Sequence, residues 1–168
     1  MTTKTDLTED EWSRLLRGPL VAGLAISIAD PGGPIEATKE TIATIRVMTS
    51  PPTDEQLLAD IAGEIKRLAE RRENPFGDLR VEGGAMASQH VLDELRAIDV
   101  VLRTKVDEAE AEAYRGWLLA AAQASAEAAK EGGFLGIAAK RVSEGEADML
   151  ERLRDALGMA SQVTPGLE

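Results

Sequence analysis

Acidic residues flank two double-glycine interruptions of this chain, and their carboxylates are the side chains best placed to do chemistry. The first interruption is Asp30-Pro31-Gly32-Gly33-Pro34, and Glu36 and Glu40 follow it. The second begins at Glu131-Gly132-Gly133, and a helical pattern resumes at Ser143-Glu144-Gly145-Glu146. An acid at the C-terminal end of a helix opposes the helix dipole, which favours cations there. A bound cation is one way to offset that cost.

The first candidate metal site consists of Asp30, Glu36 and Glu40. Glu36 and Glu40 stand one helical turn apart and share a face, and Asp30 can approach them across the turn. Oxygen-only ligand sets suit Ca²⁺, Mg²⁺ or Mn²⁺. A structural role stays open, because acids in a first helical turn are stabilising by themselves and Asp before Pro often starts a turn. The spacing does not follow the EF-hand loop.

The second candidate metal site consists of Glu127, Glu131, Glu144 and Glu146, and the intervening loop can bring Glu144 back towards Glu131. Glu127 lies one turn before Glu131 on the same helical face. Glu146 has a competing role, because a glutamate three residues after Ser143 completes a capping box. The glycines after Glu131 lack the lysine–hydroxyl pair and the preceding strand of a phosphate-binding loop, so nucleotide binding is not expected.

Other catalytic chemistry finds little support in the residue types. His90 is the only histidine, whereas a di-iron bundle needs Glu-x-x-His motifs on two helices, and residue 87 is alanine. The chain has no cysteine, which excludes disulfides, thiolate nucleophiles and cysteine-bound metals. We therefore expect a protein that is not an enzyme. An enzyme that uses carboxylates and a metal is the less favoured alternative.

Composition limits the partners. Acids outnumber bases 30 to 19, and a net charge of −11 repels nucleic-acid phosphates and anionic membranes. The N-terminus lacks a signal-peptide pattern, and the apolar stretch over 19–29 is too short to span a bilayer. We predict a cytoplasmic protein with no nucleic-acid partner and no stable membrane insertion.

The hydrophobic spacing predicts an all-α fold, a single bundle of about six helices. With 43% apolar but only 3% aromatic residues, the core must be built from Ala, Leu, Ile and Val, with Trp12, Tyr114 and Trp117 as anchors. Pro19 either kinks the first helix or begins another. We expect one helical domain over 8–158, between flexible tails at 1–7 and 159–168. The six helices are expected at about 8–30, 35–48, 54–74, 85–105, 106–130 and 143–157.

The two halves of the chain follow a related order. A helix, a Gly-Gly loop and an acid-started helix occur near 20–48 and again near 114–157. The two copies share little sequence identity. An internal pseudo-repeat of helix-loop-helix units and a chance similarity both stay open.

At these loops the chain resembles the tellurite-resistance TerB-like family of all-helical proteins. The resemblance rests on residues 24–40 and 128–146, where a small-residue helix meets an acid-plus-glycine turn and then an acidic helix start. It implies a helical bundle with acidic divalent-metal positions, working in stress response or as an interaction module. Asp30 and Glu36 would carry over to those positions, with Glu131 and Glu144 as their counterparts in the second copy.

The favoured function is therefore a non-catalytic interaction module with a protein partner or a second copy of itself. The apolar loop around Phe134, Leu135 and Ile137, followed by Lys140 and Arg141, is the expected contact surface. Self-association into a homodimer is the simplest version. The alternative is an oligomeric scaffold whose acids are solvated and bind no ligand.

Overall fold

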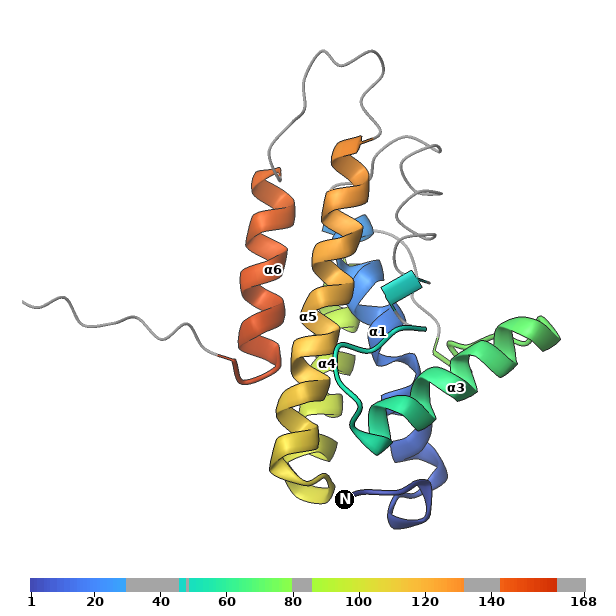
Figure 1. Cartoon of the computed structure of the whole chain (residues 1–168). Coiled ribbons are helices and arrows are strands. Elements are labelled where there is room, and N and C mark those ends of the chain that lie inside the picture. The colour runs from blue at the N-terminus through green and yellow to red at the C-terminus, as the bar shows by residue number, and fades with distance from the viewer. Residues whose placement is uncertain (30–45, 48, 80–85, 132–142, 160–168) are drawn as a thin grey trace, which may run out of the picture.

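Five α-helices make up the described part of this protein (Figure 1). The computed structural model describes residues 1–29, 46–47, 49–79, 86–131 and 143–159. No strand occurs among these residues, so the all-α expectation is confirmed. Of the helix expected over 35–48, only Arg46 and Val47 are described, and both are helical. The helices are α1 (Glu9–Ala29), α3 (Gln56–Arg71), α4 (Ala87–Lys105), α5 (Glu108–Glu131) and α6 (Glu144–Ala156).

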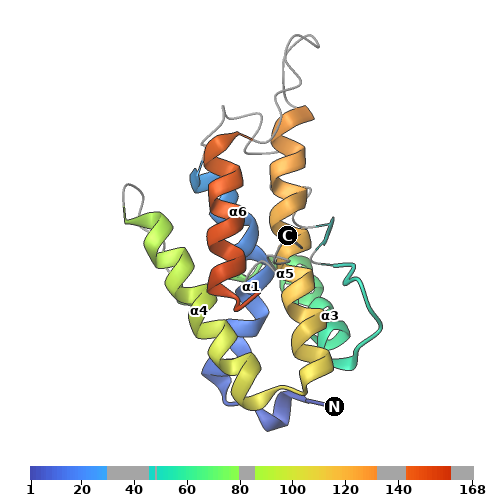
Figure 2. The ribbon, with the colours of Figure 1, turned by 90° about the vertical axis from the view of Figure 1, so that its left-hand side faces the viewer.

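Helix α1 is the central element of the bundle. It packs mainly against α5 and α4, and α6 closes against α1, α4 and α5. Figures 1 and 2 show α5 and α6 side by side, whereas α3 lies across the bundle and contacts α1 and α5. Helices separated by many residues in sequence therefore share one core.

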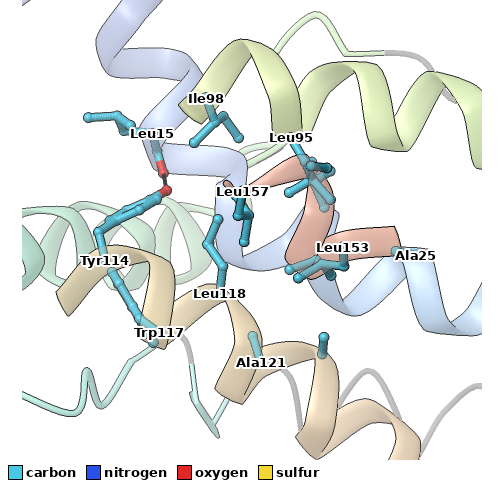
Figure 3. Close-up of a cluster of buried hydrophobic side chains, with 14 of the residues drawn as sticks. Leu15, Ala25, Leu95, Ile98, Tyr114, Trp117, Leu118, Ala121, Leu153 and Leu157 are labelled. Carbon is cyan, nitrogen blue, oxygen red and sulfur yellow. Dashed lines mark hydrogen bonds between the residues drawn. The ribbon is translucent and has the colours of Figure 1, made fainter. Parts of the chain in front are cut away.

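Small residues let the central helices approach closely. Ala22 and Ala25 of α1 and Ala121 of α5 are buried, as the alanine-rich sequence of α5 suggests. Aromatic side chains also contribute to the core, where the ring centres of Tyr114 and Trp117 lie 5.9 Å apart in an edge-to-face arrangement (Figure 3). Both are fully buried and Trp12 nearly so, which confirms the expected role of the three aromatic residues.

Pro19 lies inside one continuous helix and does not start a new one. Because proline has no N–H, the Leu15 carbonyl four residues earlier loses its helical partner. The hydroxyl of Tyr114 donates a hydrogen bond to that carbonyl (Figure 3). Gly18 makes room for it, since a Cβ there would overlap the Tyr114 hydroxyl.

Local capping fixes two helix starts as the sequence predicted. Before α1, the Thr8 N–H donates to Glu11 over 2.8 Å and the Glu11 N–H donates to the Thr8 hydroxyl over 3.2 Å. The first of these bonds lowers the pKa of the Glu11 carboxyl. Before α6, Ser143 and Glu146 exchange the same pair of bonds at 2.8 and 3.1 Å. These reciprocal bonds satisfy N–H groups that a helix start leaves without partners.

The segment 1–7, expected from the sequence to be a flexible tail, packs on the bundle. Lys4–Asp6 form a short 3-10 helix, and Thr2 is only 4% exposed. The Lys4 ammonium lies 5.1 Å from the centre of the Trp12 ring, within range of a cation–π contact. Long-range polar contacts hold this segment, and the local sequence pattern does not reveal them. Of the C-terminal tail expected at 159–168, only Met159 lies among the described residues.

Candidate functional site

The structure tests the expected metal ligands only in part. Asp30, Glu36 and Glu40 lie outside the described residues. Glu131 is the last residue of α5, and its side chain is likewise outside the description. Glu144 is exposed in the first turn of α6. Within the described ranges, no three histidine or acidic side chains come close enough to hold a metal ion.

The backbone nevertheless brings the end of α1 and the start of α6 together at one end of the bundle. The Ala29 carbonyl oxygen, at the end of α1, lies 3.0 Å from where a Cβ on Gly145 would stand. Gly145 belongs to the first turn of α6, next to Glu144. Figure 2 shows the C-terminal end of α5 at this same end of the molecule. The chain therefore enters the 30–45 segment beside the start of α6.

A buried cluster of charges joins α1 to α4. Arg17 and Glu94 are 7% and 8% exposed, and two guanidinium nitrogens of Arg17 contact one Glu94 oxygen at 2.7 and 2.8 Å. The other Glu94 oxygen accepts from Arg14 over 2.7 Å, and Arg14 also donates to Asp10 over 3.0 Å. The carboxylate of Glu94 is thus held by two arginines from the facing helix.

An open polar pocket of about 550 Å³ adjoins this cluster. The pocket is lined by the charged residues of this cluster, by two further residues of α1 and by the loop after α3. These lining residues are Asp10, Arg14, Arg17 and Glu94, then Glu9 and Ser13, and then Gly77, Asp78 and Leu79. Tyr114 of α5 lies close enough to Glu94 for that charge to affect the pKa of its phenol. Burial, and to a smaller extent the negative charge of Glu94, raise the pKa of the Tyr114 phenol well above its ordinary value of 10.0. The phenol is therefore neutral at physiological pH and able to donate its hydrogen bond to Leu15.

A second buried carboxylate joins α4 to α5. Asp99 is 2% exposed and binds the Arg115 guanidinium at 3.0 Å through one oxygen. Its other oxygen binds Arg103 at 2.9 Å. Gly158, at a positive φ of 64°, lies against the same carboxylate just after α6. A pocket of about 690 Å³ opens here, lined by Asp99, Arg103, Glu108, Glu112, Arg115, Gly158 and Met159.

A third buried carboxylate, Glu110 in the first turn of α5, binds the start of the chain. The Thr2 N–H donates to one Glu110 oxygen over 2.6 Å, and the Thr2 hydroxyl accepts from the Asp107 N–H over 3.0 Å. These two contacts pin residue 2 to the junction between α4 and α5.

Sequence reasoning missed Glu94, Asp99 and Glu110, although the spacing of two of them carries a signal. Glu94 stands three residues after Val91 and four before Ile98, both of which are core residues. Glu110 likewise precedes Tyr114 by four residues. A charged residue in register with an apolar stripe is expected to be buried with a partner. Where that partner lies, however, depends on which helices meet.

Comparisons with known proteins found no match for this chain among protein-family models, curated proteins or solved structures. Among the helices that the structure describes, none combines the length and apolar character that crossing a bilayer requires.

Proposed function

We propose that this chain is a non-catalytic helical module that acts by binding another protein or a second copy of itself. The observation that supports this proposal is the use of its buried carboxylates. Glu94 and Asp99 are each bound by two arginines, and Glu110 and Glu146 accept from backbone N–H groups. These acids hold helices and caps together, which is a structural use.

The outer face of α6 is the surface best suited to a partner with a basic surface. Four exposed acids at helical spacing form an acidic stripe on this face, with Arg152 and Arg154 beside it. The stripe consists of Glu144, Asp148, Glu151 and Asp155. Arg154 binds Glu151 at 3.1 Å, whereas Arg152 is 3.9 Å from Asp148, so the stripe remains negative overall. The apolar loop expected to make contacts, residues 134–141, immediately precedes α6 in sequence but lies outside the described residues.

Light scattering over a range of protein concentrations tests self-association. If the loop joins two copies, the parent is a dimer and the Phe134→Ser, Leu135→Ser double variant is a monomer of unchanged stability. The Asp148→Asn, Glu151→Gln variant serves as the matched control and remains a dimer.

A different protein partner is tested by cross-linking the parent chain in cells and identifying the linked sites. A partner that binds the acidic stripe is lost in the Asp148→Asn, Glu151→Gln variant and at raised salt, because ions screen exposed charges. The Glu64→Gln, Glu70→Gln variant, altered on α3, retains it. A monomer that forms no specific cross-link contradicts the proposal.

A divalent cation is the second candidate, favoured by the approach of Ala29 to Gly145. This contact places the end of α1 beside Glu144, and we propose that the two acid sites suggested by the sequence form one shared site, with carboxylates from Asp30, Glu36, Glu40, Glu131 and Glu144. Carboxylates from both loops then bind one Ca²⁺, Mg²⁺ or Mn²⁺ ion. The resemblance to the TerB-like family is consistent with this site, and a cytoplasmic stress-response role rests on that resemblance alone.

Calorimetric titration with each cation tests the metal proposal and counts the ions bound. One shared site takes one ion per chain, which raises the melting temperature by mass action. Asp30→Asn and Glu131→Gln each abolish that shift, whereas Glu112→Gln, near the other end of α5, leaves it unchanged. If the parent shows neither a heat of cation binding nor a rise in melting temperature, the alternative of a scaffold with solvated acids is supported.

A further inference from the structure

The segment that precedes α1 contacts the bundle in the way that a bound peptide would. The Thr2 N–H donates to Glu110 over 2.6 Å, and the Thr2 hydroxyl accepts from the Asp107 N–H over 3.0 Å. Two residues later, the Lys4 ammonium lies 5.1 Å from the centre of the Trp12 ring. A backbone donor, a hydroxyl and a cation of the segment therefore meet three fixed groups of the bundle.

This attachment leaves buried polar groups unsatisfied. Glu110 is 2% exposed, and its second oxygen, Oε1, has no hydrogen-bond partner within the part of the chain that the structure describes. The indole N–H of Trp12, which is 5% exposed, lacks a partner among the same residues. A buried charge is costly unless it is paired and fully hydrogen-bonded. Among residues 1–7, moreover, only Thr2 is buried. A segment with so few buried contacts opens at a low cost in free energy while the rest of the fold stays intact.

We propose that residues 2–7 are a detachable strap, and that the groups beneath it form a binding site for an extended peptide segment of another protein. The site consists of the Glu110 carboxylate, the Asp107 N–H and the face of the Trp12 ring. Figure 1 shows the strap beside the start of α5, at the opposite end of the bundle from the start of α6. The proposed role in protein binding is thereby extended to a second site, which is independent of the surfaces described above.

The strap indicates what such a peptide must contain. Its first residue needs an N–H for Glu110 and a short side-chain hydroxyl for Asp107, so threonine or serine fits. Its third residue needs a cation for Trp12, so lysine or arginine fits. The residue between them is extended, as Thr3 is in the strap, because an extended backbone turns side chains two apart to the same side. A peptide that also brings a donor to the Oε1 atom of Glu110 binds more tightly than the strap does.

The strap competes with such a peptide because it is tethered beside the site. Tethering gives it an effective concentration on the order of mM. A free peptide binds only those chains whose strap is open, so its apparent affinity is reduced by the open fraction. Removing the contacts of the strap without altering the site should therefore raise that affinity. Thr2→Pro removes the N–H and the hydroxyl, and Lys4→Ala removes the cation.

Fluorescence anisotropy of a probe peptide measures this change. The probe has the sequence of residues 2–8, is acetylated at its amino end and carries a fluorophore at its carboxyl end. The Thr2→Pro, Lys4→Ala chain, called the weakened chain, should bind this probe about tenfold more tightly than the parent, or better. A probe with alanine in place of its lysine should bind both chains less tightly, because it has no cation for Trp12.

Substitutions in the site identify where the probe binds. Adding Glu110→Leu to the weakened chain should abolish the gain in affinity, because the acceptor for the peptide N–H is lost. Glu112→Leu, at an exposed acid on the same helix, is the matched control and should preserve the gain. The proposal is overturned if the weakened chain binds the probe no better than the parent, or equally well with Glu110→Leu. Because the probe reports on this site alone, either result is distinct from the outcome for the loop and the acidic stripe.

Nuclear magnetic resonance of the parent gives a second test that needs no variant. The Thr2 amide proton should resonate far downfield, because its hydrogen bond to the Glu110 carboxylate is short. Titrating the isotope-labelled protein with unlabelled probe should move this signal towards its position in an unfolded chain, while the signals of α4 stay in place. A Thr2 signal that does not move at millimolar probe overturns the proposal, even if Glu110→Leu fails to fold.

Discussion

The Tyr114 hydroxyl donates its hydrogen bond to the Leu15 carbonyl, the group that Pro19 deprives of a partner inside α1. Proline within a helix is strongly unfavourable, partly because it removes one backbone donor. Here a side chain from α5 replaces that donor, and Gly18 leaves the space that it needs. The defect in one helix is thus a specific attachment point for another.

Tyr114→Phe should destabilise the protein by about 1–3 kcal/mol, because it leaves the buried Leu15 carbonyl without a donor. Pro19→Ala restores a backbone N–H at residue 19. The same Tyr114→Phe change should therefore cost less in a Pro19→Ala background. Urea unfolding of the four proteins measures the coupling, and equal costs in both backgrounds would disprove the relationship.

Gly18→Ala should destabilise the protein, although alanine is the better helix former by about 1 kcal/mol. The added Cβ overlaps the Tyr114 hydroxyl, and relieving such overpacking costs roughly 1–3 kcal/mol. Removing that hydroxyl with Tyr114→Phe should reduce the cost. Gly63→Ala and Gly116→Ala are the matched controls, since nothing lies within 4 Å of either added Cβ. Thermal unfolding should show a gain for the controls and a loss at residue 18.

Stability should fall at alkaline pH because of Tyr114. Its pKa in the folded protein is raised well above 10.0, first by burial and then by Glu94. Above about pH 10 the unfolded chain loses this proton while the folded chain keeps it, so the contribution to stability is complete below that pH and is lost as the pH rises. Tyr114 is the only tyrosine. Tyrosinate absorbance should therefore appear together with unfolding, and its appearance in the folded protein would refute this assignment.

Glu94→Gln should cost on the order of 3–5 kcal/mol, because it leaves the buried Arg17 without its carboxylate. Asp93→Asn, one residue away, breaks the exposed pair with Arg96 and should cost no more than about 1 kcal/mol. Chemical denaturation of the two single variants makes the comparison. Similar costs would mean that the buried Arg17–Glu94 pair contributes no more to stability than the exposed Asp93–Arg96 pair.

Local signals in the sequence were enough to predict the class of fold and several helix ends. The boxes at Thr8–Glu11 and Ser143–Glu146 join residues three apart, so the pattern and the structure coincide. Pro19 shows where such reasoning stops. Whether it breaks the helix depends on a donor to Leu15, and that donor is 99 residues away.

The polar contacts between helices were harder to predict from the sequence, because they also join residues that are far apart in the chain. Glu94 could have been placed in the core from its spacing, but Arg17 is 77 residues away and becomes its partner only when α1 meets α4. Thr2 and Glu110 are 108 residues apart, and nothing local distinguishes Thr2 from the residues of a tail. Glu144 was predicted from its place after a loop, and whether it binds a cation stays a prediction.

The central position of α1 affects how this chain acquires its structure during synthesis. Helix α1 leaves the ribosome before α4 and α5, the two helices on which it mainly packs. The apolar face of α1 therefore lacks its native packing partners until residues beyond 100 have emerged from the ribosome. Because folding slows as contacts join more distant residues, docking of α1 should limit the rate, although helical bundles generally fold fast. Molecular chaperones would find their main target on the nascent chain in this helix.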